Sequence, residues 1–369
     1  MSGFKEFLKR DFVVIAAGAA ALVSCALVPV TDYIEYVDTD VLGILFSLML
    51  IISGLRGNNF LARVTDIIVR KTRIEGTRMA LTVVSVLTFF LSMFVTNDAS
   101  LIALVPVTAV LFADYPGILI YAIVVQTVAA NMGSMATPFG NPQNLFIFSS
   151  YGITAEKFFE ASLPVSLISL GAVLLLSLFV KNKPLVPDFS EGSELKNKRY
   201  IALYGVLFVL VLLSVFKILD VLVVFASVCV VVIIIEPKRF TEVDYGLLLT
   251  FVFFFIFVGN VQRIAGVSAF IEKLVDGREF GASVLVSQVI SNVPAAVMLS
   301  GFTENWRALM LGTDIGGLGT PIASLASLIS MRIYGGTENP RVLKFLGVFS
   351  AVNFSLLILM CFFAAYTQF

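Results

Sequence analysis

The chain has 369 residues, of which 59% are hydrophobic and 14% charged, and its 25 basic and 25 acidic side chains leave no net charge. Soluble domains carry about 25% charged residues, so the composition excludes a soluble enzyme, a basic nucleic-acid-binding protein and a disordered chain. The absence of His also excludes His-dependent catalysis, metal binding and proton relays. An all-α, polytopic membrane protein remains, with the lipid bilayer as its solvent.

Nine apolar segments approach or exceed the length of about 20 residues that a membrane-spanning helix needs. In chain order they are residues 11–30, 41–55, 117–145, 161–180, 200–216, 219–235, 244–262, 305–331 and 343–366. The first segment ends at Pro29 without a small-residue cleavage site, so it is predicted to be a span and not a signal peptide. Cys25, Cys229 and Cys361 lie far apart in apolar runs and are interpreted as small core residues.

Two further apolar stretches, 79–112 and 280–302, are interrupted midway by polar residues. The interruptions are Thr96-Asn97-Asp98 in the first stretch and Ser291-Asn292 in the second. Each stretch is either two spans joined by a very short turn or a re-entrant hairpin that dips into the membrane and returns. The polar tips favour the hairpin.

The basic residues predict an orientation. With the N-terminus in the cytoplasm and each hairpin returning to its own side, 19 of the 25 Lys and Arg residues fall in cytoplasmic segments and six outside. The positive-inside rule therefore predicts a multi-pass protein of the cell (inner) membrane with a cytoplasmic N-terminus and an external C-terminus. The count is the same if both stretches cross fully, so it leaves the hairpin depth open.

The interruptions recur in the same order along the chain. The two tips lie 195 residues apart, and Thr137-Pro138 and Thr320-Pro321, which break the spans that follow them, lie 183 residues apart. A charged segment, 58–75 or 263–279, precedes each hairpin and is predicted to be a helix at the membrane surface.

By the predicted orientation, the two hairpins enter from opposite sides of the membrane. The sequence thus predicts inverted repeats, each with one re-entrant hairpin and one discontinuous helix. The first repeat covers residues 1–180, a linker and connecting span cover 181–218, and the second repeat covers 219–369. Inverted repeats with broken helices are typical of secondary transporters.

Two acidic residues fall inside apolar segments, Asp98 at the first tip and Asp314 in the second broken span. Carboxylates within the membrane usually belong to ion or substrate pathways. Alternatively, Asp98 caps the helix after the tip, and Asp314 satisfies backbone groups loosened by nearby glycines. The repeat favours a role for at least one of them as a ligand of the coupling ion or the substrate, because each acid lies at a break. Asn131 stands six residues before the first Thr-Pro pair, as Asp314 does before the second.

The segment 137–144 is the most polar stretch within a span. Two prolines and Gly140 exclude a regular helix there. The amides of Asn141 and Asn144 offer both donors and acceptors, which suits a polar solute that is held and released. A surface loop between two shorter helices is the alternative interpretation.

These residues resemble a known family. Asn97-Asp98, and Gly312-Thr313-Asp314-Ile315-Gly316 followed by Thr320-Pro321-Ile322-Ala323-Ser324-Leu325-Ala326, are similar to motifs of the ion transporter superfamily. That group contains arsenite permeases, citrate-type and dicarboxylate transporters, and sodium/proton antiporters. The second motif looks most similar to the arsenite permease branch. The resemblance implies a scaffold domain and a moving transport domain in an elevator-type mechanism, and often a homodimer.

The chain departs from the dicarboxylate branch, where both tips resemble Ser-Asn-Thr. An Asp at position 98 would repel a polyanion. We therefore expect a secondary active transporter, and no enzyme, that moves a small anion or a weak acid such as arsenite on an H⁺ or Na⁺ gradient, with no cofactor. A citrate or dicarboxylate symporter, an Na⁺/H⁺ antiporter and a channel are the alternatives.

The predicted site follows from these motifs and the resemblance. The expected substrate-binding residues are Thr96, Asn97, Thr137, Gly140, Asn141, Asn144, Ser291, Asn292, Thr320 and Ser324. The expected coupling-ion residues are Asp98, Asp314 and Asn131, and the ligands for a bound Na⁺ would be Asp98, Asn97, Asn292 and Asp314.

Overall fold

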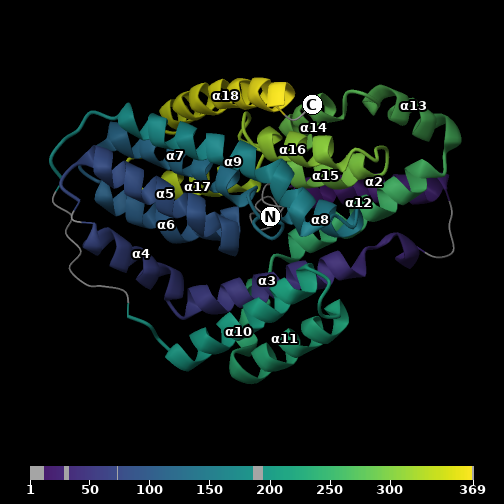
Figure 1. Ribbon diagram of the computed structural model, residues 1–369, viewed down its shortest axis with the longest axis horizontal. Coiled ribbons are helices and arrows are strands. Elements are labelled where there is room, and N and C mark those ends of the chain that lie inside the picture. The colour runs from purple at the N-terminus through teal and green to yellow at the C-terminus, as the bar shows by residue number, and fades with distance from the viewer. Residues whose placement is uncertain (1–11, 29–32, 73, 186–193, 368–369) are drawn as a thin grey trace, which may run out of the picture.

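The computed structural model describes residues 12–28, 33–72, 74–185 and 194–367. Within these ranges the secondary structure is helical, apart from an isolated β-bridge between Gly76 and Pro184 (Figure 1). Seven described helices are long and apolar enough to span a membrane. They are α3 (Thr39–Gly57), α5 (Thr77–Val95), α7 (Pro116–Ser134), α9 (Ala155–Leu178), α10 (Lys198–Val215), α12 (Tyr245–Gln262) and α18 (Val342–Thr367). The predicted all-α, polytopic architecture is confirmed.

Two other predicted spans form shorter apolar helices. They are α2 (Phe12–Leu27), which packs along α12, and α11 (Val221–Ile235), which packs against α3 and α10. The ends of the first predicted span, residue 11 and residues 29–30, lie outside the described residues. Short 3-10 helices, η1 (Ile34–Tyr36) and η2 (Pro237–Glu242), precede α3 and α12.

Both interrupted stretches form helical hairpins. α5 and α6 (Asn97–Leu111) are joined by Thr96 alone, and α14 (Glu279–Ile290) and α15 (Asn292–Ser300) are joined by Ser291 alone. At a rise of about 1.5 Å per residue, α14 and α15 are roughly 18 and 14 Å long, too short to cross a hydrocarbon core of about 30 Å. The first hairpin has longer helices, of 19 and 15 residues.

Both spans that follow the hairpins are broken at their Thr-Pro pairs, as predicted. α7 ends at Ser134 and α8 covers Pro142–Ser150, whereas α16 covers Trp306–Gly316 and α17 covers Leu325–Gly335. In each break a proline lacks the N–H that a continuous helix needs.

The second half of each broken helix packs on the opposite half of the chain. α8 contacts α15 and α16, and α17 contacts α6 and α7. Figure 1 shows the first hairpin, α5 and α6, at the left of the view and α13 at the right, with α8, α14 and α15 between them.

The predicted surface segments form helices too. They are α4 (Phe60–Lys71) and α13 (Ala265–Val275), and each immediately precedes its hairpin. α4 has one apolar face and one charged face, which is the pattern of a helix that lies in the interface.

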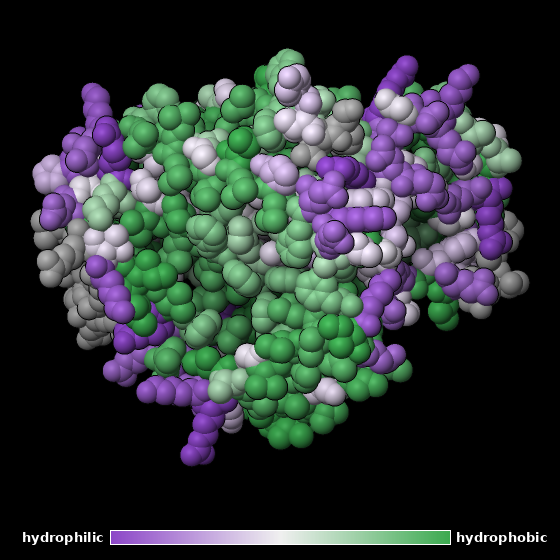
Figure 2. All heavy atoms as spheres, viewed as in Figure 1, coloured by the Kyte–Doolittle hydropathy of each residue, from purple (hydrophilic) through white to green (hydrophobic). Residues whose placement is uncertain are grey.

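The surface has the distribution of a membrane protein. Figure 2 shows a broad hydrophobic region across the face in view, with hydrophilic residues gathered toward the left and right ends. Large apolar side chains are exposed along the long helices, for example Leu167 on α9, Val209 on α10, Ile234 on α11 and Phe362 on α18. Such side chains are stable when they face lipid.

A polar cluster ties α3, α10 and η2 together at one end of the molecule. Arg239 binds Glu236 at 2.6 Å and Glu242 at 2.9 Å, and Arg56 binds Glu242 at 3.2 Å. Tyr204 donates a hydrogen bond to Glu236 at 3.0 Å. Burial raises the pKa of both glutamates, but the hydrogen bonds and positive charges around them outweigh it, so each pKa lies below its usual value.

Candidate functional site

The two hairpin tips have the same backbone conformation. Thr96 has φ 75° and ψ 155°, and Ser291 has φ 80° and ψ 154°. This region is essentially restricted to glycine, and a residue with a Cβ held there costs about 1–3 kcal/mol. In both tips, the Asn that follows accepts a hydrogen bond from the next backbone N–H, at 2.9 Å for Asn97 and 3.0 Å for Asn292. Two separate segments therefore have the same strained turn and the same side-chain contact.

Each Thr-Pro break is fastened to its own hairpin. The Thr137 hydroxyl donates to the Met93 carbonyl at 2.6 Å, and the Thr320 hydroxyl donates to the Gln288 carbonyl at 3.0 Å. Both carbonyls belong to the residue three positions before the tip. Both threonine hydroxyls therefore donate their protons to hairpin carbonyls and hold the breaks in place. This structural role is additional to the predicted contact with the solute.

The breaks also contact the opposite half of the chain, in equivalent pairs. Ser324, the cap of α17, donates to Asn131 Oδ1 on α7 at 2.9 Å. Asn141, the cap of α8, donates to Asp314 Oδ1 on α16 at 3.0 Å. The two donors lie 183 residues apart in the sequence, and so do the two acceptors. Side chains predicted to share one site are thus brought together from both halves.

The first tip joins the Asn131 side of this network. Asn97 donates to Asn131 Oδ1 at 3.2 Å, and Asn131 Nδ2 donates to the Gly317 carbonyl at 3.4 Å. The Asn292 side chain lies close to Gly317, since a Cβ built there would stand 3.0 Å from Asn292 Nδ2. The Asn292 N–H donates to the Ala323 carbonyl at 2.9 Å. The two tips therefore approach the same turn of the second break.

Asp314 is 2% exposed and lies within a shell of amides. Asn141 and Gln143 both donate to its Oδ1, at 3.0 and 3.2 Å. Three buried acceptor oxygens remain without a donor among the described residues, and they are Asp314 Oδ2, Gln143 Oε1 and Asn144 Oδ1. Buried acceptors of this kind are stabilised by a proton or a cation.

Asp98 makes no hydrogen bond to Asp314 in the described part of the structure. The side chain that caps α6 is that of Thr96, which accepts from the Ala99 N–H at 3.5 Å. Asp98 Oδ1 is buried and has no donor among the described residues. The capping role considered for Asp98 is therefore taken by its neighbour.

Two other predicted residues, Gly140 and Asn144, determine the backbone conformation of the first break. A Cβ at Gly140 would overlap the Ser134 carbonyl, so the chain can pass there only as glycine. Asn144 donates to the Met135 carbonyl at 3.3 Å, and its own N–H is bound by Asn141 Oδ1 at 2.9 Å.

Three glutamines extend the polar network beyond the predicted residues. Gln143 holds Asp314, as described above. Gln288 Nε2 binds the Gly316 and Leu318 carbonyls at 2.8 and 3.0 Å, and Gln126 links α5 to α6 through hydroxyls on both helices. A glutamine inside an apolar helix is the signal that could have marked Gln288 and Gln126.

The sequence matches the family model of citrate transporters over residues 5–305. The chain belongs to the citrate transporter family. This membership confirms the predicted resemblance to arsenite-permease and citrate-type transporters. It identifies the protein as a multi-pass membrane transporter, and the family and its named relatives indicate transport and no enzymatic activity.

Individual relatives of this citrate transporter family member are transporters or membrane proteins by name. An uncharacterised transporter of Methanocaldococcus jannaschii is 36% identical over 309 residues, 82% of each chain. The inner membrane protein YbiR of Escherichia coli is 28% identical over 252 residues, 66% of each chain. A Dictyostelium discoideum protein with arsB in its name is 25% identical over 185 residues, which are 49% of this chain and 32% of that protein.

Proposed function

We propose that this member of the citrate transporter family is a secondary active transporter that moves a small anion or weak acid, coupled to H⁺ or Na⁺ through Asp314. The observation that carries the proposal is the surroundings of that carboxylate. Asn141 and Gln143 donate hydrogen bonds to only one of its oxygens, and the other is buried without a donor, as are the side-chain oxygens of Gln143 and Asn144. A proton on Asp314 Oδ2, or a Na⁺ bound beside it, would compensate the buried negative charge.

The position of Asp314 suits coupling. Its partners come from the break of the other half, so a bound cation would tighten the contact between α16 and the segment before α8. Asp98, with its own buried oxygen lacking a donor, is proposed as a second cation-binding group beside Asn97. A cation bound at either place would change the strength of the contacts between the two halves.

The character of the polar network supports a neutral or weakly acidic solute. Amides and hydroxyls surround the two tips, and both charged groups are acidic. We therefore place the solute between the tips, against Asn97, Asn292 and the second break. Without a basic partner in this network, a polyanion such as citrate would be bound only together with cations.

The repeated contacts support an inverted-repeat organisation with residues 1–180 and 219–369 as its halves. The same turn, the same Thr clasp and the same cap-to-helix hydrogen bond occur in each half at constant spacing. We propose that the hairpins and broken helices move together in an elevator-type cycle, while α3, α10, α11 and η2 form part of the scaffold. The polar cluster around Arg239 would keep that scaffold rigid.

The experiment is a thermal-unfolding screen of the purified protein with Na⁺, Li⁺, arsenite, citrate, succinate and sulfate across pH. A ligand that binds the folded state raises the unfolding temperature. We expect Na⁺, or acidification from pH 7 to 5, to stabilise the wild type by several degrees, and Asp314→Asn to lose that response. Asp220→Asn, an exposed helix cap whose function Asn retains, is the matched control. An undiminished cation and pH response in Asp314→Asn would contradict the proposal.

A further inference from the structure

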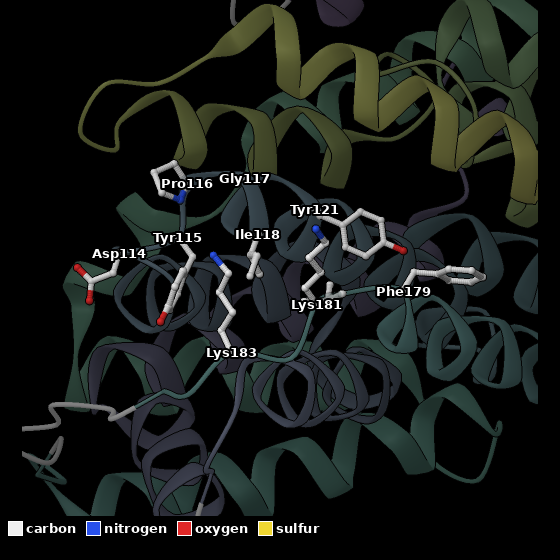
Figure 3. A pocket seen from close by; sticks show the side chains of 10 residues that line it. Asp114, Tyr115, Pro116, Gly117, Ile118, Tyr121, Phe179, Lys181 and Lys183 are labelled. Carbon is white, nitrogen blue, oxygen red and sulfur yellow. The ribbon is translucent and has the colours of Figure 1, made fainter.

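A hollow of about 400 Å³ lies at the start of α7, away from the hairpin tips (Figure 3). Its walls come from the first turn of α7 and from the segment that leaves α9. Its lining includes Asp114, Tyr115, Gly117, Ile118, Lys181 and Lys183. Two of the lining side chains are basic and one is acidic, so the hollow carries a net positive charge.

The two lysines reach the hollow because of the local backbone. Lys181-Asn182-Lys183 follows α9 outside any helix, and the side chains of Lys181 and Lys183, two positions apart, both line the hollow. Figure 3 shows the Lys181 and Lys183 side chains rising on either side of Ile118. Asn182 serves the other face, where its Oδ1 accepts from the Arg78 N–H at 3.3 Å.

One buried threonine fixes this segment in place. The Thr77 hydroxyl donates to the Lys181 carbonyl at 2.8 Å and accepts from the Lys183 N–H at 3.0 Å. The Thr77 N–H donates to the Lys183 carbonyl at 2.9 Å. The Lys183 ammonium also lies over the Tyr115 ring, 4.9 Å from its centroid. The cationic wall is thus preorganised by the start of the first hairpin.

The opposite wall offers one backbone N–H group. α7 begins with Pro116, which has no N–H. The Ile118 and Leu119 N–H groups both donate to the Tyr115 carbonyl at 2.9 Å, so the Gly117 N–H is the one left without a helical acceptor. A Cβ built at Gly117 would meet nothing within 4 Å, so the space in front of it is open. A helix N-terminus and two ammonium groups that face one hollow together form a binding site for a phosphate group.

The surface next to the hollow is apolar. Leu175, Leu178 and Phe179, at the end of α9, are 57%, 55% and 72% exposed. These apolar side chains can pack against acyl chains, whereas a free phosphate ion has no apolar part that would contact them. We propose that this hollow binds the phosphate headgroup of an anionic glycerophospholipid, with its acyl chains along the end of α9. Basic pockets between membrane helices bind such headgroups in the same way.

The test is native mass spectrometry of the full chain in detergent, titrated with phosphatidylglycerol or phosphatidylcholine. We expect the wild type to bind phosphatidylglycerol in preference to phosphatidylcholine. Lys181→Gln/Lys183→Gln should bind phosphatidylglycerol roughly 30-fold more weakly, from about 1 kcal/mol per lysine near the membrane surface. Lys196→Gln/Lys198→Gln, which changes the same Lys-Asn-Lys sequence at an exposed place outside the hollow, should bind as the wild type does.

Gly117→Leu provides a second variant, which fills the hollow and keeps both lysines. It should also lose phosphatidylglycerol, while its unfolding temperature in phosphatidylcholine stays that of the wild type. Equal losses in the two lysine double variants, or unchanged binding in Lys181→Gln/Lys183→Gln, would overturn the proposal. Displacement of the lipid by millimolar glycerol 3-phosphate would also overturn it and would assign the hollow to soluble phosphate esters.

Discussion

At the scale of single residues, Thr96 and Ser291 hold the most demanding backbone of the polar site. Each has a positive φ in a region that excludes most side chains, and each places an Asn at the start of the following helix. The packing of the hairpins offsets the free-energy cost of this strained backbone in both halves. We infer that the position of the two asparagines has a functional role.

Replacing Thr96 by Gly should therefore raise, or at least not lower, the unfolding temperature, because relief of about 1–3 kcal/mol of strain offsets the loss of a weak cap. Transport should fall, since the hydroxyl-Asn turn is no longer fixed. Ala103→Gly, in the interior of α6, is the matched control and should lower the unfolding temperature through a cost of about 1 kcal/mol. A decrease in Thr96→Gly as large as that of the control would contradict the strain argument.

Most of the polar site could be predicted at this scale, and the reason is physical. Asp314, Asn131 and Asn141 are conspicuous because a polar group inside the membrane must have a purpose. What Asp314 binds could not be predicted, because its partners lie 171 and 173 residues away. The sequence predicts that the Thr137 and Thr320 hydroxyls contact the solute. It does not indicate that they also donate to backbone carbonyls of the hairpins, because those carbonyls lie more than 30 residues away along the chain.

At the scale of elements, close helix crossings hold each broken helix against its hairpin. A Cβ on Gly133 of α7 would overlap the Phe89 carbonyl and Ser92 of α5. A Cβ on Gly316 of α16 would stand 2.8 Å from the Ser287 Cβ of α14. Small residues at such crossings allow the backbones to approach closely within a membrane.

Gly133→Ala should destabilise the protein by about 1–3 kcal/mol, because the added methyl group overpacks the α5–α7 contact. Gly171→Ala in α9 should leave the protein as stable or make it slightly more stable, since a Cβ there meets nothing within 4 Å and alanine favours the helix. Unfolding temperatures in the same detergent measure both effects. Equal unfolding temperatures of the two variants would contradict a close contact between α5 and α7 at Gly133.

The Arg239 cluster belongs to this scale as well, because it joins three elements. The pKa of Glu236 and that of Glu242 are lowered by folding. A carboxyl with a lowered pKa stabilises the fold above its unfolded value, near 4.3, and this contribution is lost as pH falls through the folded value. Acid below about pH 4 should therefore weaken the attachment of η2 to α3 and α10.

Arg239→Gln should lower the unfolding temperature at pH 7 by several degrees, since each of two partly buried carboxylates loses one of its partners. The decline of the unfolding temperature between pH 5 and pH 3 should be shallower than in the wild type. Arg341→Gln, an exposed position, should change neither quantity. An Arg239→Gln variant with the wild-type profile would show that the cluster contributes nothing to scaffold stability.

At the scale of the whole molecule, the order of elements in each half was predictable and the packing between halves was not. Apolar length and polar interruptions locate the hairpins and the breaks, because both are local properties of the chain. The exchange of α8 and α17 between halves depends on contacts across more than 170 residues. The short helices of the second hairpin, α14 and α15, favour re-entry over crossing, a choice that charge counting leaves open.

The central claim, that two hairpins enter the membrane from opposite sides to form one transport site, is tested most directly by cysteine labelling. Single cysteines at Ala113 and Asp276, which lie exposed near the open ends of the two hairpins, are introduced into a chain whose three native cysteines are replaced by Ser. A membrane-impermeant maleimide on intact cells should label Asp276→Cys at once and Ala113→Cys only after permeabilisation. Labelling of both positions from the same side would contradict the inverted arrangement.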